Sequence, residues 1–344
     1  MMCPGLTREF EQAPFPRRLV PAPKTFFIPM DKEIAALLQR VKEAGRTPFW
    51  QSTPETARGG PTLMRLLFGD APAVAHVEDL SFTTRDGSSI GARLYIPSPD
   101  ADSLIVFFHG GGWVIGSVAD YHPFTARLAC DTGCAVLSVD YRLAPEHSFP
   151  RPVEDAQAAL AIASREGGQW LGKSLRRLVA MGDSAGGTLA TVATRLHGLT
   201  NDLKPVDLQV LAYPVTDANF ETNSYQKLAE GFLLTRRDMQ WFWDQYCPDI
   251  SRRSDPEATP ISASDLSSMP PTVLLCGTLD PLLDEGRNYG HRLSEAGVPV
   301  KVVSCEGLVH GFLAMINYSP TAGRAYQDIV NAIRDCSRSP DDAS

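Results

Sequence analysis

The sequence predicts an α/β fold with a mostly parallel central sheet of about eight strands, flanked by helices. Three observations lead to this class. From Val77 onward, short apolar runs alternate with helical segments, and the residues before Val77 carry helical signals only. A long aromatic-rich segment between Tyr213 and Pro271 interrupts the alternation. Alternating strands and helices with apolar strands are typical of a parallel sheet that is covered on both faces.

The N-terminal part is expected to be helical. Residues 30–45 place apolar side chains at helical spacing between Ile34 and Val41. A proline at the first position of a helix, Pro54, marks a second start. Residues 63–68 indicate a further short apolar helix.

The strands follow in a regular order. Two paired strands are predicted at Val77–Thr84 and Ile90–Ile96, joined by a turn at residues 85–88. Buried strands are predicted at Leu104–Phe108, Ala135–Val139, Leu178–Met181, Leu208–Tyr213, Val273–Cys276 and Val300–Val303. Helices are predicted near residues 121–131, 152–166, 185–197, 284–296 and 321–335.

The segment between Tyr213 and Pro271 is too apolar for a free loop, because it contains Trp241, Phe242 and Trp243. We expect it to pack with the apolar face of the N-terminal helix as a lid over the sheet edge. The alternative is an ordinary extra layer of the core.

Composition excludes several classes of protein. The 344 residues are 43% hydrophobic and 21% charged, which argues against disorder over most of the chain. No apolar run reaches the ~18–20 residues of a membrane helix, so no membrane insertion is expected. A net charge of −8 without a basic block makes nucleic acid a poor partner. Residues 1–30 lack the apolar region of a secretory signal.

Cysteine and histidine usage predicts a cytoplasmic protein without a metal site. The seven cysteines are scattered, odd in number and lack a CxxC pair, which is typical of free thiols in a reducing compartment. The seven histidines are isolated and no HExxH motif occurs.

The pentapeptide Gly182–Gly186 has the pattern G-x-S-x-G around Ser184. A predicted strand precedes it and a predicted helix follows it, which is the context of a nucleophile elbow. The glycines allow a turn so tight that a side chain would collide with neighbouring backbone. Ser184 is therefore the candidate nucleophile; the alternative is a packing turn rich in glycine.

A serine hydroxyl needs a base, and the base needs an orienting acid. Asp280 and His310 each follow the end of a predicted parallel strand, on the side of the sheet where Ser184 also lies. Asp284 is the second candidate for the acid, but it fits better in the first turn of the next helix.

Three glycines at 110–112 follow the strand that ends at Phe108, inside the segment His109–Trp113. Such a loop can point amides at a developing oxyanion, and Gly111, Gly112 and Ala185 are the expected donors. A dinucleotide loop is the alternative, but its G-x-G-x-x-G spacing fails here.

Residues 167–174 satisfy the P-loop pattern G-x-x-x-x-G-K-[ST]. A P-loop follows a strand and opens a helix, whereas this stretch follows a predicted helix and leads into a strand. We interpret it as a connection, with nucleotide binding as the alternative.

Taken together, these motifs resemble the hormone-sensitive-lipase-like branch of the α/β-hydrolases, also called family IV esterases. The resemblance covers roughly residues 75–335. It rests on His109–Trp113, Asp140–His147, Gly182–Gly187, Asp280–Gly286 and His310–Phe312.

The resemblance implies an α/β-hydrolase fold and a serine carboxylesterase that needs no metal or organic cofactor. It implies Ser184 as nucleophile, Asp280 as acid, His310 as base, and an oxyanion hole of Gly111, Gly112 and Ala185. It divides the chain into an N-terminal helical cap segment (1–75), a catalytic domain (76–216 and 266–338), a cap insert (217–265) and a tail (339–344).

The aromatic cap predicts a small ester with short- to medium-chain groups. We also expect Trp113, Trp241 and Phe312 to bind substrate. An amidase, a deacetylase or a lactone hydrolase could use the same triad. A non-catalytic small-molecule-binding homologue is a remoter alternative, because such homologues lack the histidine that stands here at 310. A homodimer is left open.

Overall fold

The computed structural model describes residues 29–45, 47–59, 63–200 and 202–337. The tail at 339–344 and the first part of the N-terminal segment lie outside these residues. Within the described part of the chain, no helix has the length and apolar character that would let it span a bilayer.

One eight-stranded sheet runs through the molecule, in the order β1-β2-β4-β3-β5-β6-β7-β8. The strands are β1 (His76–Thr83), β2 (Ser89–Ile96), β3 (Ser103–Phe108), β4 (Ala135–Asp140), β5 (Arg177–Asp183), β6 (Leu208–Ala212), β7 (Thr272–Leu279) and β8 (Val300–Val309). β2 runs antiparallel to β1 and β4, and all other neighbours are parallel. The predicted mostly parallel sheet is confirmed.

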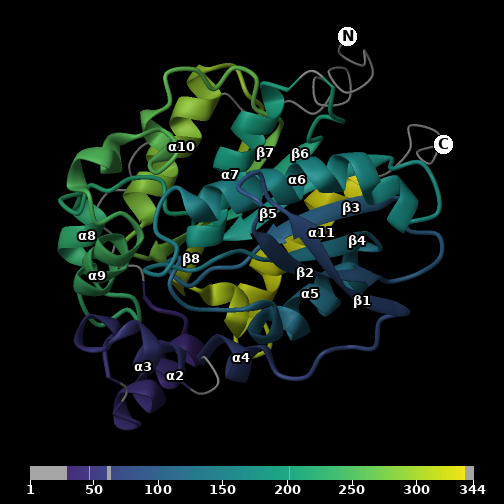
Figure 1. Cartoon of the computed structure of the whole chain (residues 1–344). Helices are drawn as coiled ribbons and strands as arrows, with labels where there is room; N and C mark the ends of the chain where they lie inside the picture. The colour runs from purple at the N-terminus through teal and green to yellow at the C-terminus, as the bar shows by residue number, and fades with distance from the viewer. Residues whose placement is uncertain (1–28, 46, 60–62, 201, 338–344) are drawn as a thin grey trace.

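Helices cover both faces of the sheet (Figure 1). One apolar cluster joins the sheet to α6 (Arg151–Trp170), α7 (Ala185–Gly198) and α10 (Leu283–Glu295). The other joins it to α5 (Val118–Thr132) and α11 (Pro320–Ser337). Each central strand contributes to both clusters: in β3, Val106 belongs to the first and Phe107 to the second. A strand buried on both faces reads as an unbroken apolar run, which is why the sequence revealed these strands.

The stretch 167–174 joins the end of α6 to β5. It precedes a strand and opens no helix, so its amides form no phosphate-binding helix terminus. The interpretation as a connection is confirmed.

The described N-terminal segment contains α2 (Lys32–Glu43), the short helix η1 (Phe49–Gln51), α3 (Pro54–Arg58) and α4 (Leu63–Phe68). The carboxylate of Asp31 caps α2 by accepting hydrogen bonds from the amides of Glu33 and Ile34, at 3.1 and 3.2 Å. Ile34 is fully buried in the second apolar cluster.

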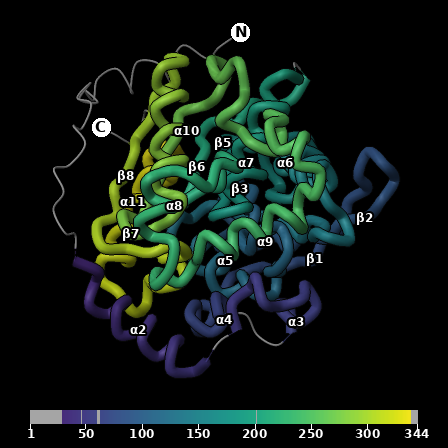
Figure 2. The backbone as a smooth tube through the Cα atoms, turned by 90° about the vertical axis from the view of Figure 1, so that its left-hand side faces the viewer, coloured from purple at the N-terminus to yellow at the C-terminus, as the bar shows by residue number. Residues whose placement is uncertain are grey.

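The insert between β6 and β7 contains α8 (Asn223–Lys227), α9 (Arg236–Tyr246), η2 (Ile250–Ser254) and η3 (Pro260–Ser262). In Figure 2, its green trace approaches the purple N-terminal helices. The ring of Phe49 lies 5.0 Å from that of Phe242 and stacks on Trp241 at 6.3 Å between centroids. The amide of Trp50 donates to Asp238 at 3.2 Å.

The expected partner of the N-terminal helix needs correction. We expected the apolar face of residues 30–45 to cover the aromatic run at 241–243. In the structure this face shares a cluster with Phe232 and Leu233 of the insert, whereas the run at 241–243 lies in the other cluster and meets Phe49. α2 ends at Glu43, and the connection that follows it contacts α9 through Phe49.

Replacing Ile34 with alanine tests whether α2 is an integral part of the core. We expect Ile34→Ala to lower the free energy of unfolding by about 2–5 kcal/mol, because it removes a fully buried side chain. Leu66→Ala is the matched control, since Leu66 is 60% exposed and should lose little. Urea denaturation measures both; equal losses would contradict the packing of α2.

Candidate active site

Ser184 lies at the turn between β5 and α7, with φ 54° and ψ −124°. A positive φ is costly for a residue with a side chain, so the surroundings must hold it in place. A Cβ on Gly182 would overlap the carbonyl oxygen of Gly186, and a Cβ on Gly186 would overlap that of Phe108. Both glycines are therefore required by close backbone contact, as the elbow motif predicts.

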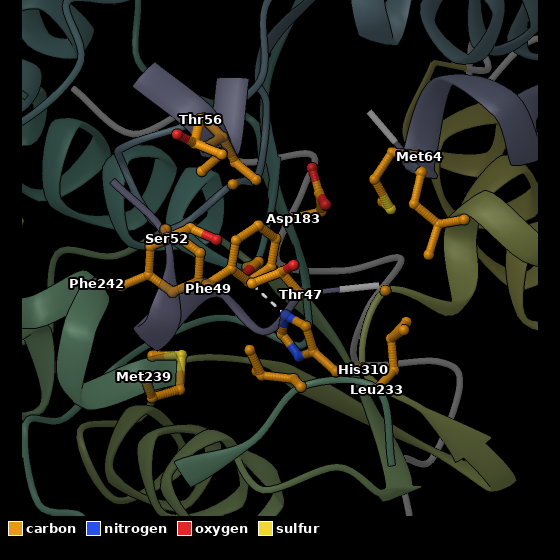
Figure 3. A pocket seen from close by; sticks show the side chains of 18 of the residues that line it. Thr47, Phe49, Ser52, Thr56, Met64, Asp183, Leu233, Met239, Phe242 and His310 are labelled. Carbon is orange, nitrogen blue, oxygen red and sulfur yellow. Dashed lines mark hydrogen bonds between the residues drawn. The ribbon is translucent and has the colours of Figure 1, made fainter. Parts of the chain in front are cut away.

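The structure brings Ser184, His310 and Asp280 together in a hydrogen-bonded chain. His310 Nε2 lies 2.8 Å from Ser184 Oγ (Figure 3, dashed line), and His310 Nδ1 lies 2.8 Å from Asp280 Oδ2. Asp280 is buried, and its other oxygen accepts a hydrogen bond from the amide of Leu282 at 2.8 Å. This carboxylate favours a proton on Nδ1, which leaves Nε2 free to accept the serine proton.

The predicted oxyanion donors come from the glycine loop and from the residue that follows Ser184. Gly111 and Gly112 have φ of +122° and +59° and line the same cavity as Ser184. A Cβ at Gly111 would overlap the carbonyl of Ile115, and one at Gly112 would overlap the ring of Phe242. Ala185 is the first residue of α7, where helix amides have no intrahelical acceptor.

A buried aspartate that the sequence analysis missed ties the elbow to the glycine loop. Asp183 Oδ1 accepts a hydrogen bond from the Gly110 amide at 2.8 Å, and Oδ2 accepts one from the Tyr121 hydroxyl at 3.0 Å. Burial raises the pKa of Asp183 to about 6. On the other side of the loop, Tyr141 donates to the carbonyl of His109 at 2.7 Å.

Asp284, the second candidate for the acid, binds the insert. Its Oδ2 accepts a hydrogen bond from the Ser224 amide at 2.8 Å, and its own amide donates to Ser224 Oγ at 3.2 Å. Ser224 Oγ in turn donates to the carbonyl of Pro281 at 2.6 Å. The turn that carries Asp280 is thereby joined to the start of α8, and we call this arrangement the Ser224 clamp.

Glu285 makes a second connection between the acid turn and the insert. It is almost fully buried, and its Oε1 accepts hydrogen bonds from the amides of Thr216 and Asp217 at 2.8 and 3.3 Å. Burial, assisted by the charges of Asp217 and Asp280, raises the pKa of Glu285 well above its usual range.

A cavity of about 340 Å³ opens above Ser184. The N-terminal segment and the insert both contribute to its walls, as Figure 3 shows. From the N-terminal segment come Thr47, Phe49, Ser52, Thr56, Ala57, Gly59, Leu63 and Met64, and from the insert Leu233, Leu234, Met239 and Phe242. Within the described residues, no group of three or more histidine, cysteine or acidic side chains is placed to hold a metal ion.

Trp113, Trp241 and Phe312, which we predicted to bind substrate, do not line this cavity. Trp113 is fully buried and stacks on Tyr246 at 3.9 Å, and Phe312 is fully buried against Tyr213, with 4.9 Å between ring centroids. The helical turn of α9 directs Phe242 towards the cavity and Trp241 towards Phe49.

Comparisons with known proteins agree with this geometry. A family model described as the alpha/beta hydrolase fold matches residues 105–314. An ethyl acetate hydrolase of Pseudomonas putida is 35% identical over 315 residues, covering 89% of this chain and 98% of the relative. The carboxylic ester hydrolase LipN of Mycobacterium tuberculosis is 40% identical over 265 residues, covering 75% and 70%.

Solved structures show the same likeness. A hyperthermophilic esterase from Pyrobaculum calidifontis superimposes with a TM-score of 0.82 at 32% identity, covering 90% of this chain and 99% of the other. The chain belongs to the hormone-sensitive-lipase-like esterases of the α/β-hydrolase superfamily.

Substitution of the two neighbouring acids tests which one orients His310. Asp280→Asn should lower kcat by roughly 10⁴, because it removes the acceptor that fixes the tautomer and stabilises the imidazolium. Asp284→Asn keeps an oxygen for the Ser224 amide and should lower kcat by less than about tenfold. Steady-state kinetics with one soluble ester measures kcat for both variants. A larger loss in Asp284→Asn than in Asp280→Asn would make Asp284 the acid.

Asp183→Asn tests the buried carboxylate through pH. The pKa of Asp183 is raised from 3.8 to about 6, so the folded protein binds this proton more tightly than the unfolded chain. The contribution of Asp183 to the free energy of unfolding therefore falls as the pH rises from about 4 to about 6. The loss is about 3 kcal/mol, at ~1.4 kcal/mol per pKa unit. Relative to the wild type, Asp183→Asn should gain stability over this range. Urea denaturation at several pH values measures it; a constant difference would contradict the raised pKa.

Proposed function

We propose that this protein is a serine carboxylesterase that hydrolyses short- to medium-chain esters through an acyl-enzyme. The observation that carries the proposal is the pair of 2.8 Å hydrogen bonds that His310 makes with Ser184 and Asp280, beside a largely apolar cavity. The esterases among its relatives support the same reaction class.

The mechanism follows from the positions of these groups. His310 Nε2 takes the proton of Ser184 as its oxygen attacks the ester carbonyl carbon, and Asp280 stabilises the imidazolium. The amides of the oxyanion loop and of Ala185 donate to the negative oxygen that develops. His310 then protonates the leaving alcohol, and water attacks the acyl-enzyme by the same route.

Cavity size supports a preference for small substrates. A volume of about 340 Å³ lies near the lower end of the ~300–1,000 Å³ typical of ligand sites. The same triad could open an amide or a lactone, and a comparison of matched ester, amide and lactone substrates measures that selectivity. A non-catalytic binding role would leave the complete hydrogen-bonded triad without a use.

We also propose a cytoplasmic location, because the cysteines in the described residues are unpaired, whereas structural disulfides are typical of oxidising compartments. The partner is a small-molecule ester. The homodimer considered above stays a prediction, which sedimentation measures.

Ser184→Ala tests the nucleophile. We expect a loss on the order of 10⁴–10⁶ in kcat and no labelling by a fluorophosphonate probe, because the triad acts as a unit. Circular dichroism should show an unchanged fold. More than about a tenth of wild-type activity in this variant would contradict the assignment.

Chain-length preference tests whether the size of the cavity limits the substrate. With p-nitrophenyl esters, kcat/KM should be highest for roughly two to eight acyl carbons, because longer chains exceed the cavity. No rise in rate should accompany the appearance of an oil–water interface. Highest activity on emulsified long-chain fats would contradict a closed cap.

A further inference from the structure

A second cavity of about 440 Å³ lies beside the catalytic one and has no place in the mechanism above. We call it the α2 groove. It lies between α2 and the connection at residues 231–235 of the insert, the two segments that approach each other in Figure 2. Its lining consists of Met30, Ala35, Leu38, Gln39, Val41, Lys42, Thr47, Pro48, Phe49, Gly231, Leu233, Thr235 and Asp238.

The α2 groove adjoins the catalytic cavity. Thr47, Phe49 and Leu233 line both spaces, so these three side chains form the partition between them. Figure 3 labels the same three side chains and His310 among the residues that line the catalytic cavity. A substrate that outgrows the catalytic cavity in this direction meets the partition first.

In the partition, Phe49 and Leu233 are partly buried, whereas Thr47 is exposed. Phe49 packs on one side against Phe242, at 5.0 Å between ring centroids. Leu233 has a φ of +74°, a value that costs energy for a residue with a side chain, and Gly231 before it has +91°. With this backbone conformation, the side chain of Leu233 lies between the two cavities and lines both of them.

Beyond the partition, most of the groove's surface is apolar, with the polar side chains of Gln39, Lys42, Thr235 and Asp238 among its lining. Ala35, Leu38 and Val41 repeat at intervals of three residues and share one face of α2, while Gln39 and Lys42 complete the lining from that helix. Such a surface fits a flexible hydrocarbon chain, with its end towards solvent. A charged or strongly polar ligand would find few buried partners there.

We propose that the α2 groove is a subsite for the far end of an alkyl chain that Phe49 and Leu233 close off in the wild type, so that these two residues set the longest chain the enzyme accepts. The proposal rests on the proposed ester hydrolysis and extends it by naming the two residues that limit the length of the aliphatic chain. Continuity through shared lining residues is the reason to assign the groove to the substrate.

Phe49→Ala is the first test. Hydrolysis is measured with p-nitrophenyl alkanoates of four to fourteen carbons, below their critical micelle concentrations. Removing the ring should raise kcat/KM for long chains relative to butyrate, by about fourfold for each methylene group that gains a buried position. Phe232→Ala is the matched control: it also removes a phenylalanine ring from the cap, but Phe232 lines neither cavity.

Leu38→Trp is the second test, because Leu38 lines only the groove. In the Phe49→Ala background, the larger side chain should abolish the gain for long chains. A parallel series of acetates with lengthening alcohol groups shows which end of the ester uses the subsite. A gain in kcat/KM with chain length in the alkanoate series alone indicates the acyl end, and a gain in the acetate series alone indicates the alcohol end.

The outcomes separate the proposals. A gain in Phe49→Ala that Leu38→Trp reverses supports the subsite. A gain that persists in the double variant, or equal gains in Phe49→Ala and Phe232→Ala, overturns it. If Leu38→Trp instead changes the sedimentation coefficient and leaves the preference for alkyl-chain length unaltered, the groove contacts a second copy of the protein and the proposal fails. Loss of all ester hydrolysis in the wild type would refute the proposed function itself.

Discussion

The backbone of Ser184 is the constraint on which the other features depend. Its positive φ holds the hydroxyl above the sheet, and the close contacts of Gly182 and Gly186 leave no room to relax it. Because β5 and α7 are buried along most of their length, the fold fixes both ends of this turn. His310 and Asp280 then need only end their own strands at the same edge of the sheet to complete the triad.

The cap contributes to the catalytic machinery as well as covering it. The ring of Phe242 occupies the space that a side chain at Gly112 would need, so α9 sets the shape of the oxyanion loop from above. From below, Asp183 holds the Gly110 amide of the same loop. The loop thus lies between the cap and the elbow, and its geometry depends on the packing of both.

Sequence reasoning recovered the sheet and the triad because both are local patterns. Central strands read as apolar runs, and the reactive residues follow the ends of those strands. It failed for Trp113, Trp241 and Phe312, because the direction of a side chain depends on contacts with distant segments. Trp113 stacks on Tyr246 of the insert, Trp241 stacks on Phe49, and Phe312 packs against Tyr213. It also missed Asp183 and Glu285: an acid inside a motif reads as solvated, and only the fold reveals its burial.

The Ser224 clamp has a consequence for how this cap can be exchanged or evolve. Ser224 binds Asp284 and Pro281, and Glu285 binds the amides at 216 and 217, so the root of the insert and the turn of the catalytic acid form one hydrogen-bonded unit. A chimaera that receives a relative's insert at the end of β6 would separate these partners. Exchange of substrate specificity between such enzymes therefore requires a two-part cassette, in which residues 216–224 and the acid turn are inherited together.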